Sequence, residues 1–96
     1  MVSYRLSKAA AEDLGHLYTD GIIRYGLEQA NHYYDGLINQ FQLICDNPRI
    51  GFNSDEIVPN LQKFQYRRHV IFFINTDTGI LIVRVLGEEM DFSQHL

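Results

Sequence analysis

Only one cysteine, Cys45, and no tryptophan occur among the 96 residues. A lone cysteine cannot form an internal disulfide bond, and it cannot supply the several thiolates of a cysteine-based zinc site. Cys45 follows Ile44 at the end of a predicted helix, where a buried structural thiol is the common outcome. A nucleophilic cysteine would need a neighbouring base, and no motif in the sequence supplies one.

Long apolar runs and ligand-binding motifs are also absent. No segment approaches the roughly 20 apolar residues that span a bilayer, and residues 1–14 lack the apolar core of a signal peptide. We therefore expect a cytoplasmic protein with no membrane partner. The four histidines, His16, His32, His69 and His95, lack a metal-ligand spacing such as HxxxH. Without a glycine-rich phosphate loop or a GxSxG motif, the sequence predicts no metal site and no cofactor.

Acidic residues outnumber basic residues in this chain. The sequence has 8 Lys and Arg against 12 Asp and Glu, which gives a formal net charge of −4. The deficit occurs in both halves, with 3 basic and 6 acidic residues in 1–48 and 5 basic and 6 acidic residues in 49–96. Proteins that grip nucleic acid through its phosphates normally have a basic surface. Direct, sequence-specific nucleic-acid binding is therefore not expected.

The C-terminal part of the sequence predicts three antiparallel strands. Residues 70–74 and 80–86 are runs of β-branched and aromatic side chains, and the polar residues between them end in a glycine, which is typical of a β-hairpin. Residues 61–66 alternate in polarity and place Phe64 and Tyr66 on one face. Strands this apolar need cover on at least one face.

Two helices are predicted to supply that cover. Residues 4–6 are a candidate strand, and Ser7 can cap a helix that runs to Gly26. Apolar residues recur at spacings of three and four in this helix and in a second, which begins near Leu27 and ends at Asp46-Asn47-Pro48. So short a connection predicts an antiparallel helical hairpin.

These elements together predict the fold. We expect one α+β domain over residues 1–96, in which the helical hairpin packs on an antiparallel sheet of the three C-terminal strands plus the first strand. Residues 49–60, which contain several turn-forming residues, are expected to be irregular.

Arg84 is the most unusual residue of the predicted sheet. Alternation places it on the same face as Ile82 and Leu86, where an unpaired guanidinium group would be costly. Two interpretations remain open. Arg84 could bind an anion or stabilise a transition state on an open face of the sheet, or it could form a salt bridge with a carboxylate such as Asp91 or Glu56.

The C-terminal tail, residues 90–96, also has two interpretations. It carries the apolar residues Met90, Phe92 and Leu96 close to the chain end. Either the tail packs back onto the helices, or it forms a contact surface for a partner protein.

Taken in order, four segments resemble the ParE toxins of the RelE/ParE superfamily. The segments are YRLSKAAAEDL, FQLICDNPRIG, LQKFQYRRHVIFF and ILIVRVLGEEMDFSQHL. The resemblance covers nearly the whole chain and implies the fold described above. It also implies the toxin of a type II toxin–antitoxin pair, with a ParD-like antitoxin as partner in a hetero-oligomer. The implied target is DNA gyrase, whose inhibition blocks replication without covalent chemistry by the toxin.

Two contact surfaces follow from this resemblance. We expect the target to contact the end of the sheet and the tail, through Arg84, Met90, Asp91, His95 and Leu96. We expect the antitoxin to dock in a groove between the helical hairpin and the sheet, through Leu14, Leu17, Tyr18, Leu37 and Phe41. Relatives usually have a histidine where this chain has Gly87. This departure either attenuates toxicity or merely eases a bend into the tail.

The alternative is the other branch of the superfamily, the ribosome-dependent mRNA endonucleases similar to RelE. In that case Arg67, Arg68 and Arg84 would be catalytic and would stabilise the transition-state phosphate. Against this alternative, the loop before the sheet carries Asp55 and Glu56 rather than lysines, and the tail has no tyrosine. A net charge of −4 also suits a site on ribosomal RNA poorly.

Overall fold

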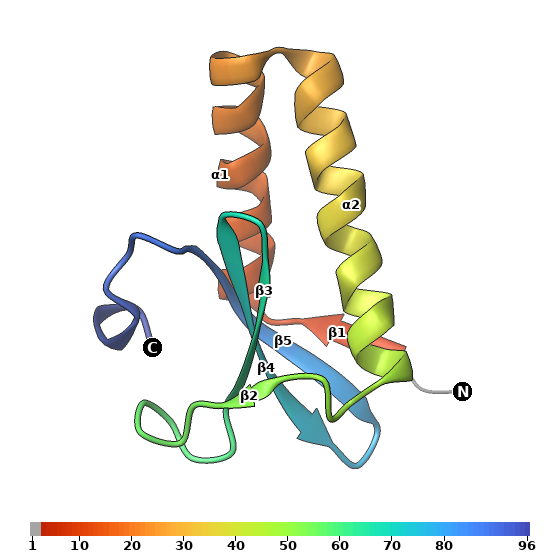
Figure 1. The fold of residues 1–96 in the computed structure, drawn as a ribbon, viewed down its shortest axis with the longest axis vertical. Coiled ribbons are helices and arrows are strands. Elements are labelled where there is room, and N and C mark those ends of the chain that lie inside the picture. The colour runs from red at the N-terminus through yellow and green to blue at the C-terminus, as the bar shows by residue number, and fades with distance from the viewer. Residues whose placement is uncertain (1–2) are drawn as a thin grey trace.

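A helical hairpin stands on a five-stranded sheet in the computed structural model, which describes residues 3–96 (Figure 1). The sheet has the strand order β1-β5-β4-β3-β2. The elements in chain order are β1 (Ser3–Leu6), α1 (Lys8–Tyr25), α2 (Leu27–Asp46), β2 (Phe52–Asn53), β3 (Gln62–Tyr66), β4 (His69–Thr76), β5 (Gly79–Gly87) and the short 3₁₀ helix η1 (Phe92–Gln94). The predicted α+β class, the helical hairpin and the three C-terminal strands are confirmed.

Two features of the sheet differ from the prediction. β1 pairs with β5 in parallel, with Leu6 opposite Ile82, so the sheet is mixed rather than antiparallel. Periodicity does not indicate this orientation, because it depends on which distant strand becomes the neighbour of β1. The second difference is β2, whose two residues pair with β3 inside the segment predicted to be irregular. A two-residue strand is too short to produce a periodic pattern.

The helical hairpin has the predicted cap and the predicted connection. The Ser7 hydroxyl oxygen accepts a hydrogen bond from the backbone N–H of Ala10 at 2.9 Å, which satisfies one free donor at the start of α1. Gly26 joins the helices with a φ of 91°, a backbone conformation that glycine adopts without steric cost. The chain can therefore reverse direction within a single residue.

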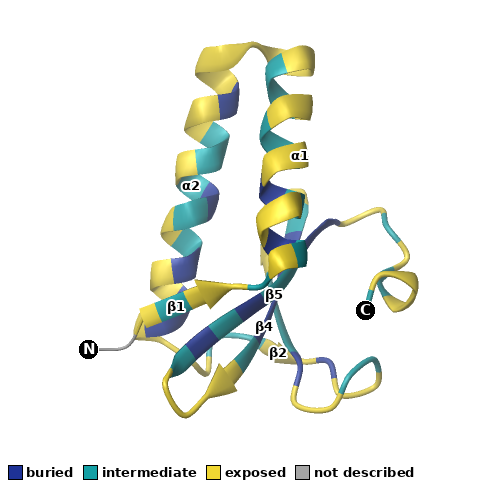
Figure 2. Ribbon diagram, turned by 180° about the vertical axis from the view of Figure 1, so that it is seen from behind, coloured by how far each residue is buried: buried dark blue, intermediate teal, exposed yellow. Residues whose placement is uncertain are grey.

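The two helices cover one face of the sheet. Inward side chains of both helices pack against β4 and β5, and Figure 2 shows buried residues along these facing surfaces. Tyr4 of β1 joins this core through an edge-to-face contact with Phe41, with ring centroids 5.3 Å apart. The buried members of this helix-side core are Ala10, Leu14, Leu37, Phe41, Ile44, Cys45, Ile71, Phe73, Ile80, Ile82 and Val85.

A second, smaller core covers the opposite face of the sheet. Its buried members are Leu61, Val70, Phe72 and Leu86. The loop before β3 and the C-terminal tail pack against it, and Phe92 contacts Phe72 edge to face at 5.0 Å. The tail therefore packs back onto the chain, but onto the sheet rather than onto the helices. The physical reason is that the helices already cover their own face, so the apolar side chains of the tail bury area only on the other one.

The far end of the helical hairpin projects beyond the sheet (Figure 1). Ile23, Tyr25 and Leu27 are 78%, 61% and 59% exposed at this end. Tyr25 and Leu27 continue the spacing of three and four of the apolar residues in their helices, which predicts inward positions, and that prediction is wrong because neither joins the helix-side core. No strand lies beside the end of the hairpin at which the two helices meet (Figure 1).

A β-bulge interrupts β5. Ile82 and Arg84 pair with consecutive residues of β4, so Val83 is the extra residue. A bulge shifts the alternation of side chains by one position. Ile82 consequently lies in the helix-side core, whereas Leu86 lies in the core on the other face. The prediction that Arg84 shares one face with both of them is therefore wrong.

Two glycines test how tightly the hairpin packs on the sheet. A Cβ atom at Gly36 of α2 would overlap the hydroxyl group of Tyr66, whereas a Cβ atom at Gly15 of α1 would meet nothing within 4 Å. We expect Gly15→Ala to raise the free energy of unfolding by about 0.5–1 kcal/mol through helix propensity. We expect Gly36→Ala to lower it by about 1–3 kcal/mol through overpacking. Denaturant titration measures both changes.

The clash has its own control. Tyr66→Phe removes the hydroxyl group, for which the structure shows no hydrogen-bond partner among residues 3–96. Added to Gly36→Ala, it should recover part of the lost stability. No recovery in the double variant would show that a contact other than Tyr66 limits the space at Gly36.

Candidate functional site

The candidate site lies where β5 becomes an edge of the sheet. β1 pairs with β5 only as far as Ile82. Beyond that point α1 satisfies the backbone of β5. The Ser7 hydroxyl donates to the carbonyl oxygen of Val83 at 2.6 Å, and the backbone N–H of Val85 donates to the Asp13 carboxylate at 2.9 Å. Buried backbone groups need such partners, so the side chains of Ser7, which caps α1, and of Asp13 in α1 take the place of the missing strand.

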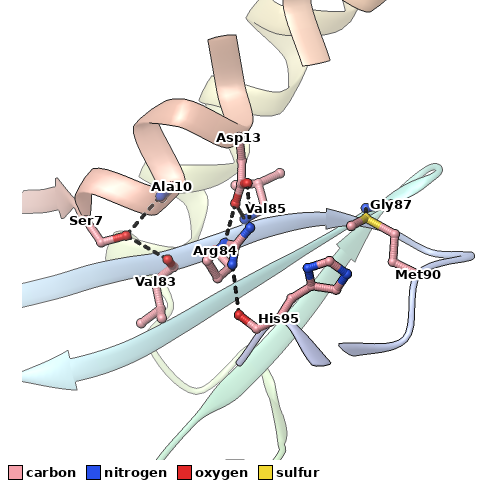
Figure 3. Close-up of polar contacts among 9 residues, drawn as sticks. All are labelled: Ser7, Ala10, Asp13, Val83, Arg84, Val85, Gly87, Met90 and His95. Atoms are coloured by element: carbon pink, nitrogen blue, oxygen red, sulfur yellow. Dashed lines mark hydrogen bonds and ion pairs between the residues drawn. The ribbon is translucent and has the colours of Figure 1, made fainter. Parts of the chain in front are cut away.

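Arg84 forms a salt bridge with Asp13 of α1, and not with Asp91 or Glu56 (Figure 3). Its Nε donates to Oδ2 of Asp13 at 2.7 Å, and its Nη2 donates to Oδ1 at 2.8 Å. This two-point geometry is the strongest form of an arginine–carboxylate pair. The side chains of Arg84 and Asp13 are 21% and 12% exposed. The hydrogen bond to Asp13 raises the pKa of Arg84, so the guanidinium group stays charged.

The remaining guanidinium nitrogen of Arg84 reaches the C-terminal tail. Nη1 donates to the carbonyl oxygen of His95 at 2.8 Å (Figure 3). The tail begins with a tight turn, in which the backbone N–H of Met90 donates to the carbonyl oxygen of Gly87 at 3.1 Å. Asp91 then caps η1 by accepting from the backbone N–H of Ser93 at 3.2 Å. Arg84 thus connects α1, β5 and the tail.

The structure brings the predicted target-contact residues together. Arg84 bonds the backbone of His95, while Met90 and Leu96 pack against the core on the same face of the sheet. The side chains of Asp91 and His95 are exposed, and those of Met90 and Leu96 are partly buried. Asp13 organises this group but is not among the predicted site residues. In the sequence it is an ordinary helical residue, because its partners lie some seventy residues further along the chain.

The predicted antitoxin residues are distributed differently. Leu14, Leu37 and Phe41 are 3%, 0% and 0% exposed, because they fill the space between the helices and the sheet. A partner cannot reach these three side chains while the hairpin stays packed on the sheet, so they are corrected to core residues. Leu17 and Tyr18 keep exposed surface. The groove expected between hairpin and sheet is occupied by the chain's own core.

The three arginines of the nuclease alternative do not converge. Arg84 is bound to Asp13 and to the tail, whereas Arg67 lies in the turn between β3 and β4, where its guanidinium group stacks 5.5 Å from the centre of the Tyr66 ring. Arg67 has a φ of 51°, and the Gln65 side-chain amide donates to its carbonyl oxygen at 2.8 Å. Arg68, in the same turn, is exposed.

Gly87 is buried and pairs with His69 across the sheet. Its φ does not lie in the left-handed region, so the bend into the tail does not require glycine. A Cβ atom there would come within 2.6 Å of the Glu89 carboxylate. Glu89 is an exposed, flexible side chain, so a larger residue at position 87 could displace it.

A second polar cluster, which the sequence analysis did not identify, lies between α2 and the start of β4. The hydroxyl oxygen of Tyr33 lies 2.7 Å from Nδ1 of His69, and its ring packs against Tyr66. Burial lowers the pKa of His69, against the opposing influence of Glu89 and Glu88. Burial also raises the pKa of the Tyr33 phenol. Both side chains are therefore neutral at pH 7. Because Tyr33 and His69 lie far apart in the chain, no local sequence pattern indicates this cluster.

Cys45 is 2% exposed, and burial raises the pKa of its thiol, as expected for a structural cysteine. Residues 3–96 contain no cluster of three or more His, Cys, Asp or Glu side chains arranged to hold a metal ion. Neither α1 nor α2 is apolar enough over a sufficient length to traverse a membrane.

Known proteins are similar to this chain in sequence. Residues 4–92 match the family model described as ParE toxin of type II toxin-antitoxin system, parDE. The chain is 35% identical over 94 residues to Toxin ParE1 of Mycobacterium tuberculosis (strain ATCC 25618 / H37Rv), which covers 97% of this chain and 96% of the relative. It is 30% identical over 96 residues to Toxin ParE1 of Caulobacter vibrioides, with 100% and 99% covered.

A solved structure shares the fold. A chain of the chromosomal ParDE TA system from P. aeruginosa superposes with a TM-score of 0.81, over 93% of this chain and 98% of that chain. The sequence identity is 22%, so this likeness concerns the arrangement of helices and strands.

The Tyr33–His69 contact predicts how stability depends on pH. Unfolded histidine has a pKa of about 6.5, and burial lowers that of folded His69. Below about pH 6.5 the unfolded state binds a proton that the folded state resists. The contribution of His69 is therefore complete above the unfolded pKa and is lost as the pH falls through the folded pKa. His69→Gln cannot titrate, so the stability of the wild type relative to this variant should fall from pH 7.5 to pH 5.5.

Urea titrations at the two pH values measure this difference. His32→Gln, at an exposed position of α2, controls for the loss of an imidazole elsewhere. A wild-type advantage over His69→Gln that grows on acidification would contradict the sign derived above.

Proposed function

The chain belongs to the ParE toxin family of type II toxin–antitoxin systems, and we propose that it inhibits DNA gyrase, blocks replication and is neutralised by a ParD-like antitoxin. Family membership supports the toxin role. The specific support for a target surface at the tail is its composition. Asp91 and His95 present exposed polar side chains beside the partly buried Met90 and Leu96, and such mixed surfaces are typical of protein contacts.

The proposed mechanism is binding and not catalysis. Arg84, the residue best placed for chemistry on the sheet, already has all of its described donors directed at Asp13 and His95. It is therefore not free to stabilise a transition-state phosphate. His69 is partly buried, and its Nδ1 atom is already in contact with the Tyr33 hydroxyl group. These internal contacts favour the gyrase proposal over the ribonuclease alternative.

The proposed target surface consists of the tail and its attachment. We assign direct contact to Asp91 and His95, whose side chains are exposed, and to the accessible parts of Met90 and Leu96. Arg84 belongs to this surface through its bond to the backbone of His95.

The proposed antitoxin surface is smaller than expected from the sequence. Leu17 and Tyr18 remain candidates because they have exposed surface on α1. The Tyr18 hydroxyl donates to the side-chain oxygen of Asn31, and its ring contacts Tyr34 edge to face at 5.3 Å. These contacts fix the position of the ring before a partner arrives, which reduces the entropy lost on binding.

Exposed apolar side chains support the existence of a protein partner. Ile23 and Phe52 are 78% and 71% exposed. Burial of such side chains against a partner would favour complex formation. A hetero-oligomer with an antitoxin accounts for such a surface.

A supercoiling assay with purified gyrase tests the target. We expect the protein to inhibit supercoiling and to increase cleaved DNA, while mRNA on programmed ribosomes stays intact. His95→Ala should weaken inhibition by roughly five-fold or more, the loss typical of an important interface residue. His32→Ala, which removes an exposed histidine from α2, should leave inhibition unchanged. Cleaved mRNA together with unaffected gyrase would establish the ribonuclease alternative.

Thermal unfolding with and without a ParD-like antitoxin tests the partner. A ligand that binds only the folded state at 100 times its Kd raises the free energy of unfolding by about 2.7 kcal/mol. We expect Tyr18→Ala to weaken antitoxin affinity more than Tyr25→Ala. Tyr25 is the control, because it is a second tyrosine of α1 and is 61% exposed. A free toxin that melts as high as the mixture would argue against the antitoxin proposal.

A further inference from the structure

Resting on the proposed function, we propose that Asp13 and Arg84 are positioning residues that hold the C-terminal tail in the conformation that contacts the target. The proposal concerns a path of hydrogen bonds from α1 to the end of the chain. Neither residue needs to touch the target for this role.

The first step of the path fixes the plane of the Arg84 guanidinium group. Asp13 Oδ2 accepts from Nε of Arg84 and also from the backbone N–H of Val85, while Oδ1 accepts from Nη2 of Arg84. Because Asp13 is bonded to the backbone of β5, the carboxylate itself cannot swing away from the strand. The planar guanidinium group bonded to it at two points is therefore held rigidly.

The second step transmits this orientation to the tail. With Nε and Nη2 directed at Asp13, Nη1 points to the other side and donates to the carbonyl oxygen of His95 at 2.8 Å (Figure 3). Within residues 3–96 this is the one hydrogen bond that joins residues 91–96 to the rest of the chain. The other bonds of the tail are local to η1.

The apolar contacts of the tail cannot replace this bond. Phe92 and Leu96 pack against the core on the face opposite the helices, and burial of apolar area is not directional. The edge-to-face contact with Phe72 orients the ring of Phe92, but burial of Leu96 does not fix the direction of the backbone at residues 93–96. The His95 carbonyl is the point at which a directional bond sets which way the exposed side chains of Asp91 and His95 face.

Two substitutions separate this role from the stability of the fold. Arg84→Lys keeps the positive charge opposite Asp13, but one ammonium group cannot reproduce the planar fork that serves both Asp13 and His95. Asp13→Asn keeps an acceptor for the Val85 N–H and removes the charge that orients Arg84. The matched control is Asp20→Asn, which breaks the exposed pair between Asp20 and Arg24 on the same helix, where the side chains are 61% and 65% exposed.

The first readout is the backbone order of residues 93–96 in the full chain, measured by ¹⁵N relaxation below the unfolding temperature. We expect order parameters to fall from values near 0.85, typical of rigid backbone, to below about 0.6 in Arg84→Lys and Asp13→Asn. Order in β4 and β5 should be unchanged. Asp20→Asn should behave as the wild type. An ordered tail in both test variants would overturn the proposal.

The second readout is gyrase inhibition beside antitoxin binding. A hydrogen bond to a charged group typically shifts an equilibrium by roughly ten-fold or more, so inhibition should weaken by about ten-fold in Arg84→Lys while antitoxin affinity is kept. If the tail loses order but inhibition is unchanged, tail position does not control the target contact and the proposal is wrong. If the wild type does not inhibit gyrase, the proposed function fails, and the relaxation result still decides whether Asp13 and Arg84 hold the tail.

Discussion

The arrangement of the chain around the candidate site depends on the hydrogen bonds that the Asp13 carboxylate accepts. It satisfies the backbone of β5 where β1 ends, and it holds Arg84 between α1 and the tail. Removal of one partner from a fully buried ion pair costs about 3–5 kcal/mol, because the remaining charge is uncompensated. Arg84 is 21% exposed, so solvent would offset part of that cost. Loss of either partner should therefore cost less than this range.

The bulge at Val83 makes this interaction possible. The extra residue in β5 reverses the faces of the sheet to which the following side chains point. Apolar side chains of β5 therefore reach both cores, and Arg84 lies at the sheet edge. The Ser7 hydroxyl accepts from Ala10 and donates to the bulge carbonyl, so the first turn of α1 is attached to the same point. A cap, a bulge and an ion pair thus form one joint between helix and strand. Bulges commonly re-aim side chains near functional sites.

The polar clusters around Arg84 and His69 are used internally, which favours the proposal that the protein acts by binding. Arg84 is committed to Asp13, and His69 contacts Tyr33 across the interface between α2 and β4. What remains accessible is the tail, with its exposed Asp91 and His95, and the exposed apolar end of the helical hairpin. The same tail covers the second face of the sheet through Phe92. The cover of this face of the sheet and the proposed target contact therefore depend on the same short segment.

The sequence by itself determined the elements and their class, because helical periodicity, the Ser7 cap, Gly26 and the apolar runs of the last strands are local patterns. It also indicated the tail as a surface of interest. Only the tertiary structure decided the parallel pairing of β1, the bulge at Val83, the burial of Leu14 and Phe41, and the partner of Arg84. Each of these depends on which distant segments become neighbours, and local periodicity contains no information about that choice. Asp13 reads as an ordinary helix residue until β5 lies beside it.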